Sequence, residues 1–346
     1  MIIREQSIYT QIKNEVSEVQ DMTEGELDAT KDRVLMRDFR KSDLNDLLDL
    51  FPRCFAKEFE VTGFDPDHVR SMVNRAFGKT GRLFLGLSRL FGREPMRFLV
   101  AEVDSKVVGT TIVNSRGKVG YISSVMVHPD YRRKGIATRL LKDATAHILR
   151  KRMRRAVLHV DSTNTPAIDV YTKLGFRPFE HIAHLIGETD SLSALEDTDE
   201  IKTRPVQKDD FDEVYNLIRV SEDPNRLKIF DFSKDNLKTP FLQRLLHFST
   251  QKKIVAIFDG KIVGYAETSY TTPKQAGSIS SIHAIAQNRS GEVERVLVSA
   301  GIKEIRKGGT NRIRVTVSSV KQELIETLKS LGFRESLAMD GMFIEV

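Results

Sequence analysis

The chain lacks tryptophan and contains one cysteine, Cys54, among its 346 residues. A single cysteine cannot form a disulfide within the chain or build a cysteine-based zinc cluster, so we expect a reducing compartment and no metal. No apolar run approaches the roughly 18 residues that cross a bilayer. The first residues also lack the apolar stretch of a signal peptide. These absences predict a cytoplasmic protein without a transmembrane segment.

Length and charge set the scale of the protein. The chain exceeds one ordinary domain of roughly 150 residues and therefore predicts two. Its residues are 40% hydrophobic and 29% charged, as in globular proteins with buried cores. The net charge of +6 and the isoelectric point near 9.2 favour an anionic ligand or an acidic partner. The same charge also fits nucleic acid and so discriminates poorly, and we expect no nucleic-acid partner.

The most informative stretch runs from Gly120 to Arg139. Residues 121–127 are apolar and β-branched, which predicts a buried strand, and Pro129 ends that strand. A basic turn containing glycine follows at residues 132–137, Arg-Arg-Lys-Gly-Ile-Ala, and leads into a helical pattern. The apolar face of the predicted helix consists of Leu140, Leu141, Ala144 and Ile148. Unpaired N–H groups and the helix dipole make such a helix start a cradle for a phosphate.

Two common phosphate-binding motifs differ from this turn. A Walker P-loop would end in Gly-Lys-Ser/Thr, and a Rossmann fingerprint would need three glycines. The order Arg-x-x-Gly-x-Ala after a strand ending in Val-Met-Val-His-Pro resembles instead the acetyl-CoA pyrophosphate loop of the GCN5-related N-acetyltransferases, the GNAT family. This resemblance covers Leu35 to Arg177 well. It implies an α/β (α+β) fold with a mixed, mostly antiparallel central sheet flanked by helices, and acetyl-CoA as co-substrate.

The resemblance also implies which residues hold acetyl-CoA. Pantetheine would run along the central strand at Val125, Met126 and Val127, where a backbone N–H would polarise the thioester carbonyl. Asn164 matches the family's asparagine, which bonds pantetheine or positions the following helix. The residues that would hold the pyrophosphate are Arg132, Arg133, Lys134, Gly135, Ile136, Ala137 and Thr138.

Two residues are candidates for proton transfer. Tyr171 matches the family's tyrosine that is thought to protonate the leaving thiolate, and a core aromatic is the structural alternative. The sequence Leu-His-Val before Asn164 resembles the branch that acetylates protein N-terminal α-amines, where a glutamate is expected at the position of His159. Histidine is a competent base at neutral pH and can act through a water. A purely structural histidine, with an ordered water as the base, is the other interpretation.

The chain repeats its pattern after an acidic stretch. Residues 120–125, Gly-Tyr-Ile-Ser-Ser-Val, return as 277–282, Gly-Ser-Ile-Ser-Ser-Ile, and Leu-Gly-Phe-Arg at 174–177 returns at 331–334. The constant offset predicts a tandem duplication of one α/β unit of about 150 residues. The second copy differs at the chemical positions: Asn288–Val293 stands opposite the basic turn, Lys321 opposite Asn164, and Leu328 opposite Tyr171. We therefore predict a degenerate second copy with a structural role or a role in shaping the acceptor cleft.

The predicted organisation has four parts. An N-terminal arm covers 1–32, the catalytic domain 33–187, an acidic linker 188–200 and the degenerate domain 201–346. The arm has helical apolar spacing and is either a docked segment or a dimerisation helix, so a homodimer is one hypothesis. Further expectations are a helix from Pro66 to Phe77, a basic amphipathic segment at 78–95, and helix N-caps at Ser42 and Thr165.

The function predicted from the resemblance is acetyl-CoA-dependent transfer of an acetyl group to a primary amine. The expected acceptor is a protein α- or ε-amine. One alternative is a small-molecule amine, as in the tandem architecture of mycothiol synthase. Another is a CoA-binding module without turnover, against which the complete loop together with Asn164 and Tyr171 argues.

Overall fold

A computed structural model describes residues 34–55, 70, 74, 78, 96–193, 200–238, 250–270, 276–285 and 291–346. The expected N-terminal arm lies outside these residues, as do most of the expected helix at 66–77 and of the segment at 78–95. The chain divides into two compact units. The first comprises residues up to Ala56, Asp65–Pro178 and Met342–Val346, and the second comprises Lys57–Phe64 and Phe179–Gly341.

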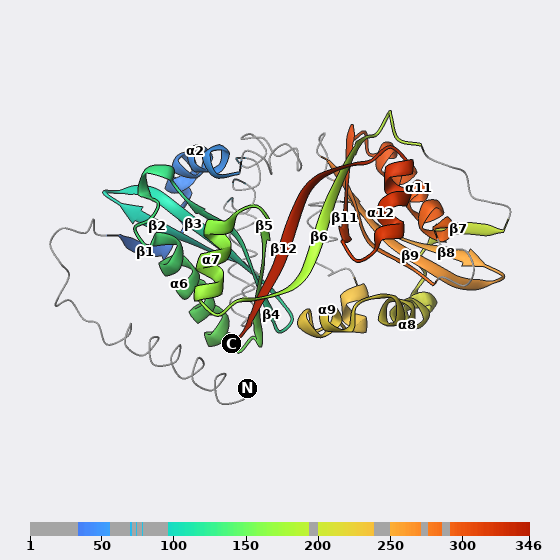
Figure 1. Ribbon diagram of the computed structural model, residues 1–346, viewed down its shortest axis with the longest axis horizontal. Coiled ribbons are helices and arrows are strands. Elements are labelled where there is room, and N and C mark those ends of the chain that lie inside the picture. The colour runs from blue at the N-terminus through green and yellow to red at the C-terminus, as the bar shows by residue number, and fades with distance from the viewer. Residues whose placement is uncertain are drawn as a thin grey trace. The chain divides into compact units, whose positions relative to one another are not determined.

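The first unit contains a sheet with helices on its faces (Figure 1). Its strands lie in the order β1-β2-β3-β4-β5, followed by the end of β12. Neighbouring strands from β1 to β4 are antiparallel, and β4 and β5 are parallel. The elements are β1 (Leu35–Asp38), α2 (Leu44–Cys54), β2 (Met96–Val103), β3 (Lys106–Arg116), β4 (Val119–Val127), α6 (Ile136–Arg150), β5 (Arg155–Asp161) and α7 (Thr165–Lys173), with short 3-10 helices η1 (Lys41–Asp43) and η2 (Pro129–Tyr131).

The second unit has the same kind of sheet, in the order β12-β6-β11-β10-β9-β8-β7, with β10 and β11 parallel. Its strands are β6 (Arg177–Glu188), β7 (Ile201–Pro205), β8 (Thr250–Phe258), β9 (Lys261–Tyr270), β10 (Gly277–Ala284), β11 (Arg312–Ser318) and β12 (Arg334–Glu345). Its helices are η3 (Lys208–Asp210), α8 (Phe211–Ser221), α9 (Pro224–Ile229), η4 (Lys234–Leu237), α11 (Glu292–Lys307) and α12 (Gln322–Ser330). The predicted fold class, a mixed and mostly antiparallel sheet flanked by helices in each half, is confirmed.

Helix α6 lies directly against the sheet of the first unit. The predicted apolar face is buried, since Leu140, Leu141, Ala144 and Ile148 are 0% exposed. Two glycines allow this close packing. A Cβ at Gly109 would lie 3.2 Å from Cγ2 of Ile136, and one at Gly120 would overlap the side chain of Ile148. Larger residues at either position would push the helix away from the sheet.

The same two contacts recur in the second unit. A Cβ at Gly264 would lie 2.6 Å from Cγ1 of Val293, and one at Gly277 would overlap the side chain of Ile305 on α11. Gly264 and Gly277 occupy the positions of Gly109 and Gly120 in the sequence repeat. Helices α6 and α11 therefore approach their sheets by equivalent contacts.

A buried ion pair also recurs at the start of each unit. The guanidinium of Arg37 donates two hydrogen bonds to the carboxylate of Asp43, at 2.7 and 3.0 Å. Arg204 binds Asp210 in the same way, at 2.5 and 2.9 Å. Burial alone would raise the pKa of the Asp43 carboxyl, but these hydrogen bonds outweigh it and hold that pKa below its usual value. The predicted repeat is thus visible in packing and in polar contacts.

The structure corrects two predicted helix N-caps. Helix α2 begins at Leu44 with Asp43 as its N-cap, not Ser42. The Asp43 side chain makes no cap hydrogen bond to α2; its carboxylate instead accepts the backbone N–H of Arg40 at 2.7 Å and binds Arg37. Helix α7 has Asn164 as its N-cap, not Thr165. The Asn164 side chain accepts the N–H of Ala167 at 3.3 Å, which satisfies one of the unpaired donors of the first turn.

The last residues of the chain belong to the first unit. Met342 and Ile344 are 2% and 6% exposed and pack in the core that contains Leu158 on β5. The backbone N–H of Val346 donates to the carbonyl of Arg154 at 3.0 Å, and Arg155 donates to Glu345 at 2.8 Å. The first unit is therefore assembled from segments far apart in the sequence.

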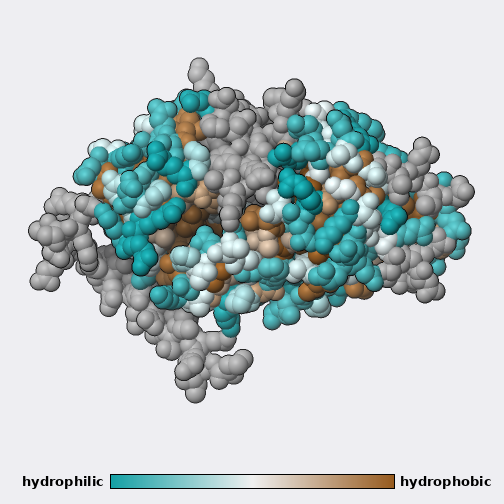
Figure 2. All heavy atoms as spheres, turned by 45° about the horizontal axis from the view of Figure 1, so that its top comes forward, coloured by the Kyte–Doolittle hydropathy of each residue, from teal (hydrophilic) through white to brown (hydrophobic). Residues whose placement is uncertain are grey.

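The segment predicted as a linker begins inside the second unit. Leu192 is 4% exposed, and the N–H of Ser193 donates to the carbonyl of Leu331 at 3.0 Å. Residues 194–199 lie outside the described part of the chain, and the predicted domain limits remain predictions. Figure 2 shows hydrophilic side chains over much of the visible described surface, with apolar ones between them. None of the described helices combines the length and apolarity that a membrane crossing requires.

Candidate functional site

The site is built around an irregularity in strand β4. The register between β3 and β4 shifts between Thr110 and Ile112, and Ser124 has a left-handed φ of 53°. Together these define a β-bulge, which bends a strand and leaves one residue out of the ladder. The parallel pairing of β4 with β5 covers Val119–Tyr121 opposite Arg155–Val157 and ends there. Past Tyr121 the two strands diverge. The backbone N–H and C=O groups of β4 there form no ladder hydrogen bonds with β5.

The predicted pantetheine residues lie immediately after this bulge. Val125 and Val127 are partly buried and pack toward the core under α6, whereas Met126 is 1% exposed and packs in the core under α2. The Met126 side chain is therefore a structural residue, and only its backbone is available to a ligand. An unpaired strand edge can bind an extended ligand as an added strand does. This geometry suits the amide-containing pantetheine arm.

The carbonyl of Val127 already has protein partners. It accepts Nε of Arg132 at 3.2 Å and the thiol of Cys54 at 3.5 Å. The first contact fixes the start of the basic turn against the end of β4. The second gives the Cys54 thiol a hydrogen-bond acceptor at the end of β4.

The basic turn ends at the N-terminus of α6. The side chains of Arg132, Arg133 and Lys134 are exposed. Gly135 is the helix N-cap with a φ of 77°, and no acidic residue lies in the first helical turn. A Cβ built on Gly135 would meet no atom within 4 Å, so the space beside it is open. Unpaired N–H groups, three cations and open space are what a pyrophosphate needs.

Ile136, Ala137 and Thr138 form the first turn of α6. Ile136 is 1% exposed and belongs to the core, so only its backbone can contact a phosphate. Ala137 and Thr138 are partly exposed beside the turn. The residues present therefore fit acetyl-CoA at the loop as well as at the strand.

His159 has a partner that the sequence did not indicate. Its Nδ1 lies 2.8 Å from the hydroxyl of Tyr121, and the two ring centroids are 5.7 Å apart. Tyr121 is the last β4 residue in register with β5, so the pair lies where the two strands begin to diverge. This contact holds the ring orientation, and the tautomer of His159 determines which of the two groups donates. The signal that could have identified Tyr121 is its place on the neighbouring strand, two residues from His159 in register.

Tyr171 lies on the other side of β5. It is 6% exposed, and it packs in the core cluster that includes Leu158 and Val160. Because side chains alternate along a strand, His159 points away from that cluster. Burial raises the pKa of Tyr171 to about 12, so its hydroxyl stays protonated at neutral pH. The structure thus brings His159 and Tyr121 together and places Tyr171 on the opposite face.

The second unit repeats the backbone geometry but not the charges. Ser281 has a φ of 52° beside a register shift in β10, and Gly291 is the N-cap of α11 with a φ of 84°. The first turn of α11 carries Glu292 and Glu294, whereas the first turn of α6 has no acid. Residues 286–290, which include Asn288, lie outside the described residues. Carboxylates at a helix N-terminus repel a phosphate, so this second helix start is unsuited to acetyl-CoA.

Comparisons with known proteins agree with this geometry. The model of the acetyltransferase (GNAT) family matches residues 45–176. An acetyltransferase of Pectobacterium atrosepticum is 30% identical over 98 residues, which cover 28% of this chain and 70% of that protein. An acetyltransferase of Sodalis glossinidius is 28% identical over 141 residues, which cover 41% of this chain and 85% of that protein.

Solved structures share the fold over most of the chain. A GCN5-related N-acetyltransferase from Sphaerobacter thermophilus aligns with a TM-score of 0.62 at 17% identity, over 91% of this chain and 96% of that one. A tandem GNAT protein from the clavulanic acid biosynthesis pathway also aligns with a TM-score of 0.62, at 15% identity over 90% and 98% of the two chains. Identities this low show the fold alone. The family model and the sequence relatives establish that the chain belongs to the GNAT family of acetyltransferases.

Proposed function

We propose that this chain transfers an acetyl group from acetyl-CoA to a primary amine within a ternary complex, and that the first unit does so. The observation that carries the proposal is the combination of the β4 bulge with the acid-free helix start at Gly135. The first offers a strand edge for pantetheine, and the second offers donors for the pyrophosphate. Bound acetyl-CoA supplies an activated thioester, and the residues of the chain manage binding and proton transfer.

His159 is the proposed base, and Tyr121 is the residue that orients it. The Tyr121 hydroxyl bonds Nδ1, and Nε2 is the proposed imidazole atom that takes the proton from the acceptor ammonium or from a water next to it. His159 lies on the face of β5 away from the α6 core. A base there removes a proton before the amine nitrogen attacks, because an ammonium has no lone pair.

Tyr171 is the proposed acid. Its raised pKa keeps the phenol protonated, as a proton donor to a thiolate must be. Tyr171 is buried on the opposite side of β5 from His159. Asn164 caps α7 and so fixes the helix that carries Tyr171.

The proposed acceptor is a protein α- or ε-amine, with the N-terminal α-amine branch as the nearer relative. The sequence around His159 and Asn164 supports that branch. A small-molecule amine is the second candidate, favoured by the structural likeness to a tandem GNAT protein from the clavulanic acid biosynthesis pathway. In both cases we propose that the chain is a tandem GNAT protein whose second unit does not hold acetyl-CoA.

An acceptor screen tests this proposal. The full chain is incubated with acetyl-CoA and N-terminal peptides, internal lysine peptides or small amines, and free thiol and acetylated product are both measured. We expect turnover with one acceptor class and its loss in Tyr171→Phe. Thiol release without any acetylated acceptor, or equal turnover in the variant, would contradict the proposed reaction.

A further inference from the structure

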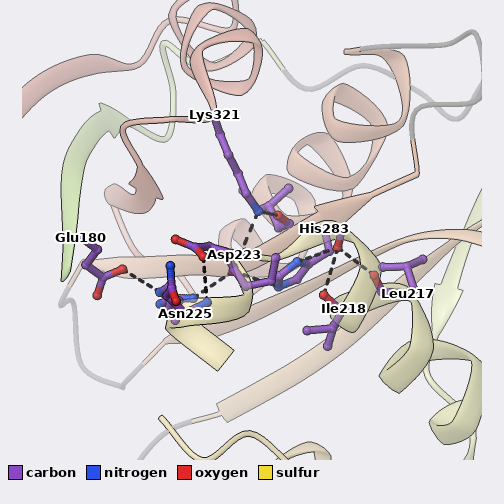
Figure 3. Close-up of polar contacts among 11 residues, drawn as sticks. Glu180, Leu217, Ile218, Asp223, Asn225, His283 and Lys321 are labelled. Atoms are coloured by element: carbon purple, nitrogen blue, oxygen red, sulfur yellow. Dashed lines mark hydrogen bonds and ion pairs between the residues drawn. The ribbon is translucent and has the colours of Figure 1, made fainter. Parts of the chain in front are cut away.

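The second unit contains a partly buried lysine where the first unit is proposed to hold acetyl-CoA. Lys321 is the N-cap of α12, as Asn164 is of α7, but it makes no side-chain cap bond. Its ammonium instead reaches to strand β10 and donates to the carbonyl of Ile282 at 3.2 Å (Figure 3). Ile282 follows the bulge residue Ser281, as Val125 follows Ser124. The lysine nitrogen therefore occupies the strand edge that corresponds to the proposed pantetheine edge.

Two glutamate carboxylates lie near this ammonium and attract it. Oε2 of Glu222, whose side chain is 7% exposed, lies 4.0 Å from Nζ of Lys321. Glu294, on the first turn of α11, attracts the same ammonium, and its Oε2 is buried with no hydrogen-bond partner among the described residues. The Lys321 side chain itself is 23% exposed. The ammonium thus has the carbonyl of Ile282 as its hydrogen-bond acceptor, and two carboxylates attract it from longer range.

The surrounding cluster fixes these carboxylates in place. Arg226 donates to Glu222 at 2.9 Å and to Glu180 at 2.7 Å. His283 lies 3.9 Å from Glu222 and has its Nδ1 bonded to Ser221 at 3.1 Å. Burial, with Lys321 and Arg226 nearby, lowers the pKa of His283 well below its usual value, so this ring is neutral. Three glutamates therefore share the positive charges of one arginine and one lysine.

The polarity of this site is opposite to that of the first unit. The first unit presents Arg132, Arg133 and Lys134 at its helix start and no acid in the first turn. The second presents Glu292 and Glu294 in the first turn of α11. A site of this polarity repels a pyrophosphate and attracts a cation.

We propose that the β10 edge at Ile282, with Glu222 and Glu294 near it, is a binding site for a primary ammonium group, and that the side chain of Lys321 occupies this site. The lysine fills the slot from within the chain and ties the start of α12 to β10 and to the end of α8. The proposal deepens the assignment of the second unit as a copy that does not hold acetyl-CoA, but it rests on the contacts of Lys321 alone.

Chemical rescue tests this site in the full chain. Lys321→Ala removes the ammonium and three carbons, and we expect the melting temperature to fall by about 3 °C or more, because Glu294 loses its counter-charge. Added n-propylammonium chloride, which matches the deleted atoms, is expected to restore at least half of the loss. Tetramethylammonium chloride at equal concentration controls for ionic strength and cannot donate a hydrogen bond.

Lys329→Ala is the matched control on the same helix. Lys329 forms surface ion pairs with Glu326 and Glu335, at 3.1 and 3.0 Å, so its loss should change the melting temperature little and give no rescue. If Lys321→Ala does not fold, Lys321→Met keeps the stem and removes the charge. It should melt below the parent chain and show no recovery with propylammonium, because the slot is full.

Three results would overturn the proposal. They are an unchanged melting temperature in both Lys321 variants, equal recovery with the two ammonium salts, and a similar response in Lys329→Ala. Acetyl transfer is measured separately in the acceptor screen. A failure of the ammonium site therefore leaves the proposed reaction standing, and a failure of the reaction leaves the ammonium site standing.

Discussion

At the scale of single residues, the contact between Tyr121 and His159 is the most consequential one in the first unit. Position 159 was predicted from the resemblance, whereas Tyr121 was not. Tyr121 and His159 are 38 residues apart in the chain and meet because β4 and β5 pair in parallel. Such a register is set by packing of the whole sheet, so no local pattern reports it.

Substitutions at this pair test the proposed base. His159→Ala should lower kcat by roughly 10²–10⁴-fold, the range for loss of a general base. Tyr121→Phe keeps the ring and removes only the hydroxyl, so we expect a smaller loss, about tenfold. Initial rates from pH 6 to 9 are the measurement, with melting temperatures as a control. A pH–rate profile unchanged in His159→Ala would assign the proton transfer to water instead.

Tyr171→Phe tests the proposed acid. The substitution should reduce kcat by roughly 10²-fold and leave the affinity for acetyl-CoA nearly unchanged. Because the pKa of Tyr171 is raised to about 12, the hydroxyl stays protonated as the pH rises to 10. The parent enzyme should therefore lose no activity through this residue between pH 8 and 10. A kcat that stays unchanged in Tyr171→Phe would contradict its role as the acid.

At the scale of elements, the two helix starts show what charge does on a shared scaffold. Helices α6 and α11 each begin after a left-handed glycine and lie against a sheet through equivalent glycine contacts. They differ in the first turn, which is free of acids in α6 and carries two glutamates in α11. The backbone of both starts is therefore alike, and the side chains determine which of them suits a phosphate.

Reversing one charge at the start of α6 tests the loop. Arg132→Glu should raise the Kd for acetyl-CoA at least tenfold, since it replaces a charge-assisted donor by a repelling carboxylate. Arg150→Glu makes the same charge change at the exposed far end of the same helix and should alter the Kd less than threefold. Titration calorimetry at fixed salt measures both variants. Equal effects would mean that the loop acts through net charge alone.

Local elements followed well from the sequence. The turn at Asp104 and Ser105, between β2 and β3, has left-handed φ values of 48° and 64°, which suit a two-residue hairpin. The helical pattern predicted after the basic turn begins at Ile136, because Gly135 before it adopts a left-handed conformation. The N-caps were the weakest predictions, since Asp43 is held by Arg37, which precedes the helix on another element.

At the scale of the whole molecule, the order of the chain does not match the order of the sheets. The prediction of two halves along the sequence placed residues 177–187 with the first copy. In the structure Phe179 and later residues of β6 belong to the second unit, and Met342–Val346 belong to the first. β6 and β12 have similar sequence patterns, and each could pair with either of the two similar sheets. The sequence repeat therefore does not indicate which strand joins which sheet.

Deleting Met342–Val346 tests the contribution of these residues. Met342 and Ile344 are buried large apolar side chains, each worth about 1.5–3 kcal/mol. The shortened chain should melt several degrees lower and lose acetyl transfer. Glu345→Gln is the control, because it removes only a half-exposed ion pair with Arg155 and should cost less than about 1 kcal/mol. A shortened chain with parental stability would refute the structural role.

The shared strand arrangement has a consequence for biosynthesis. The ribosome makes Pro178 early but must add the whole second unit before it reaches Met342. At roughly 5–20 residues per second, this interval lasts on the order of 10–30 s. During that time the edge of β5 lacks its neighbour β12, and the core beside it lacks Met342 and Ile344. The first half of this protein is thus translated first but completed last, and nascent chains are expected to need protection from aggregation over that interval.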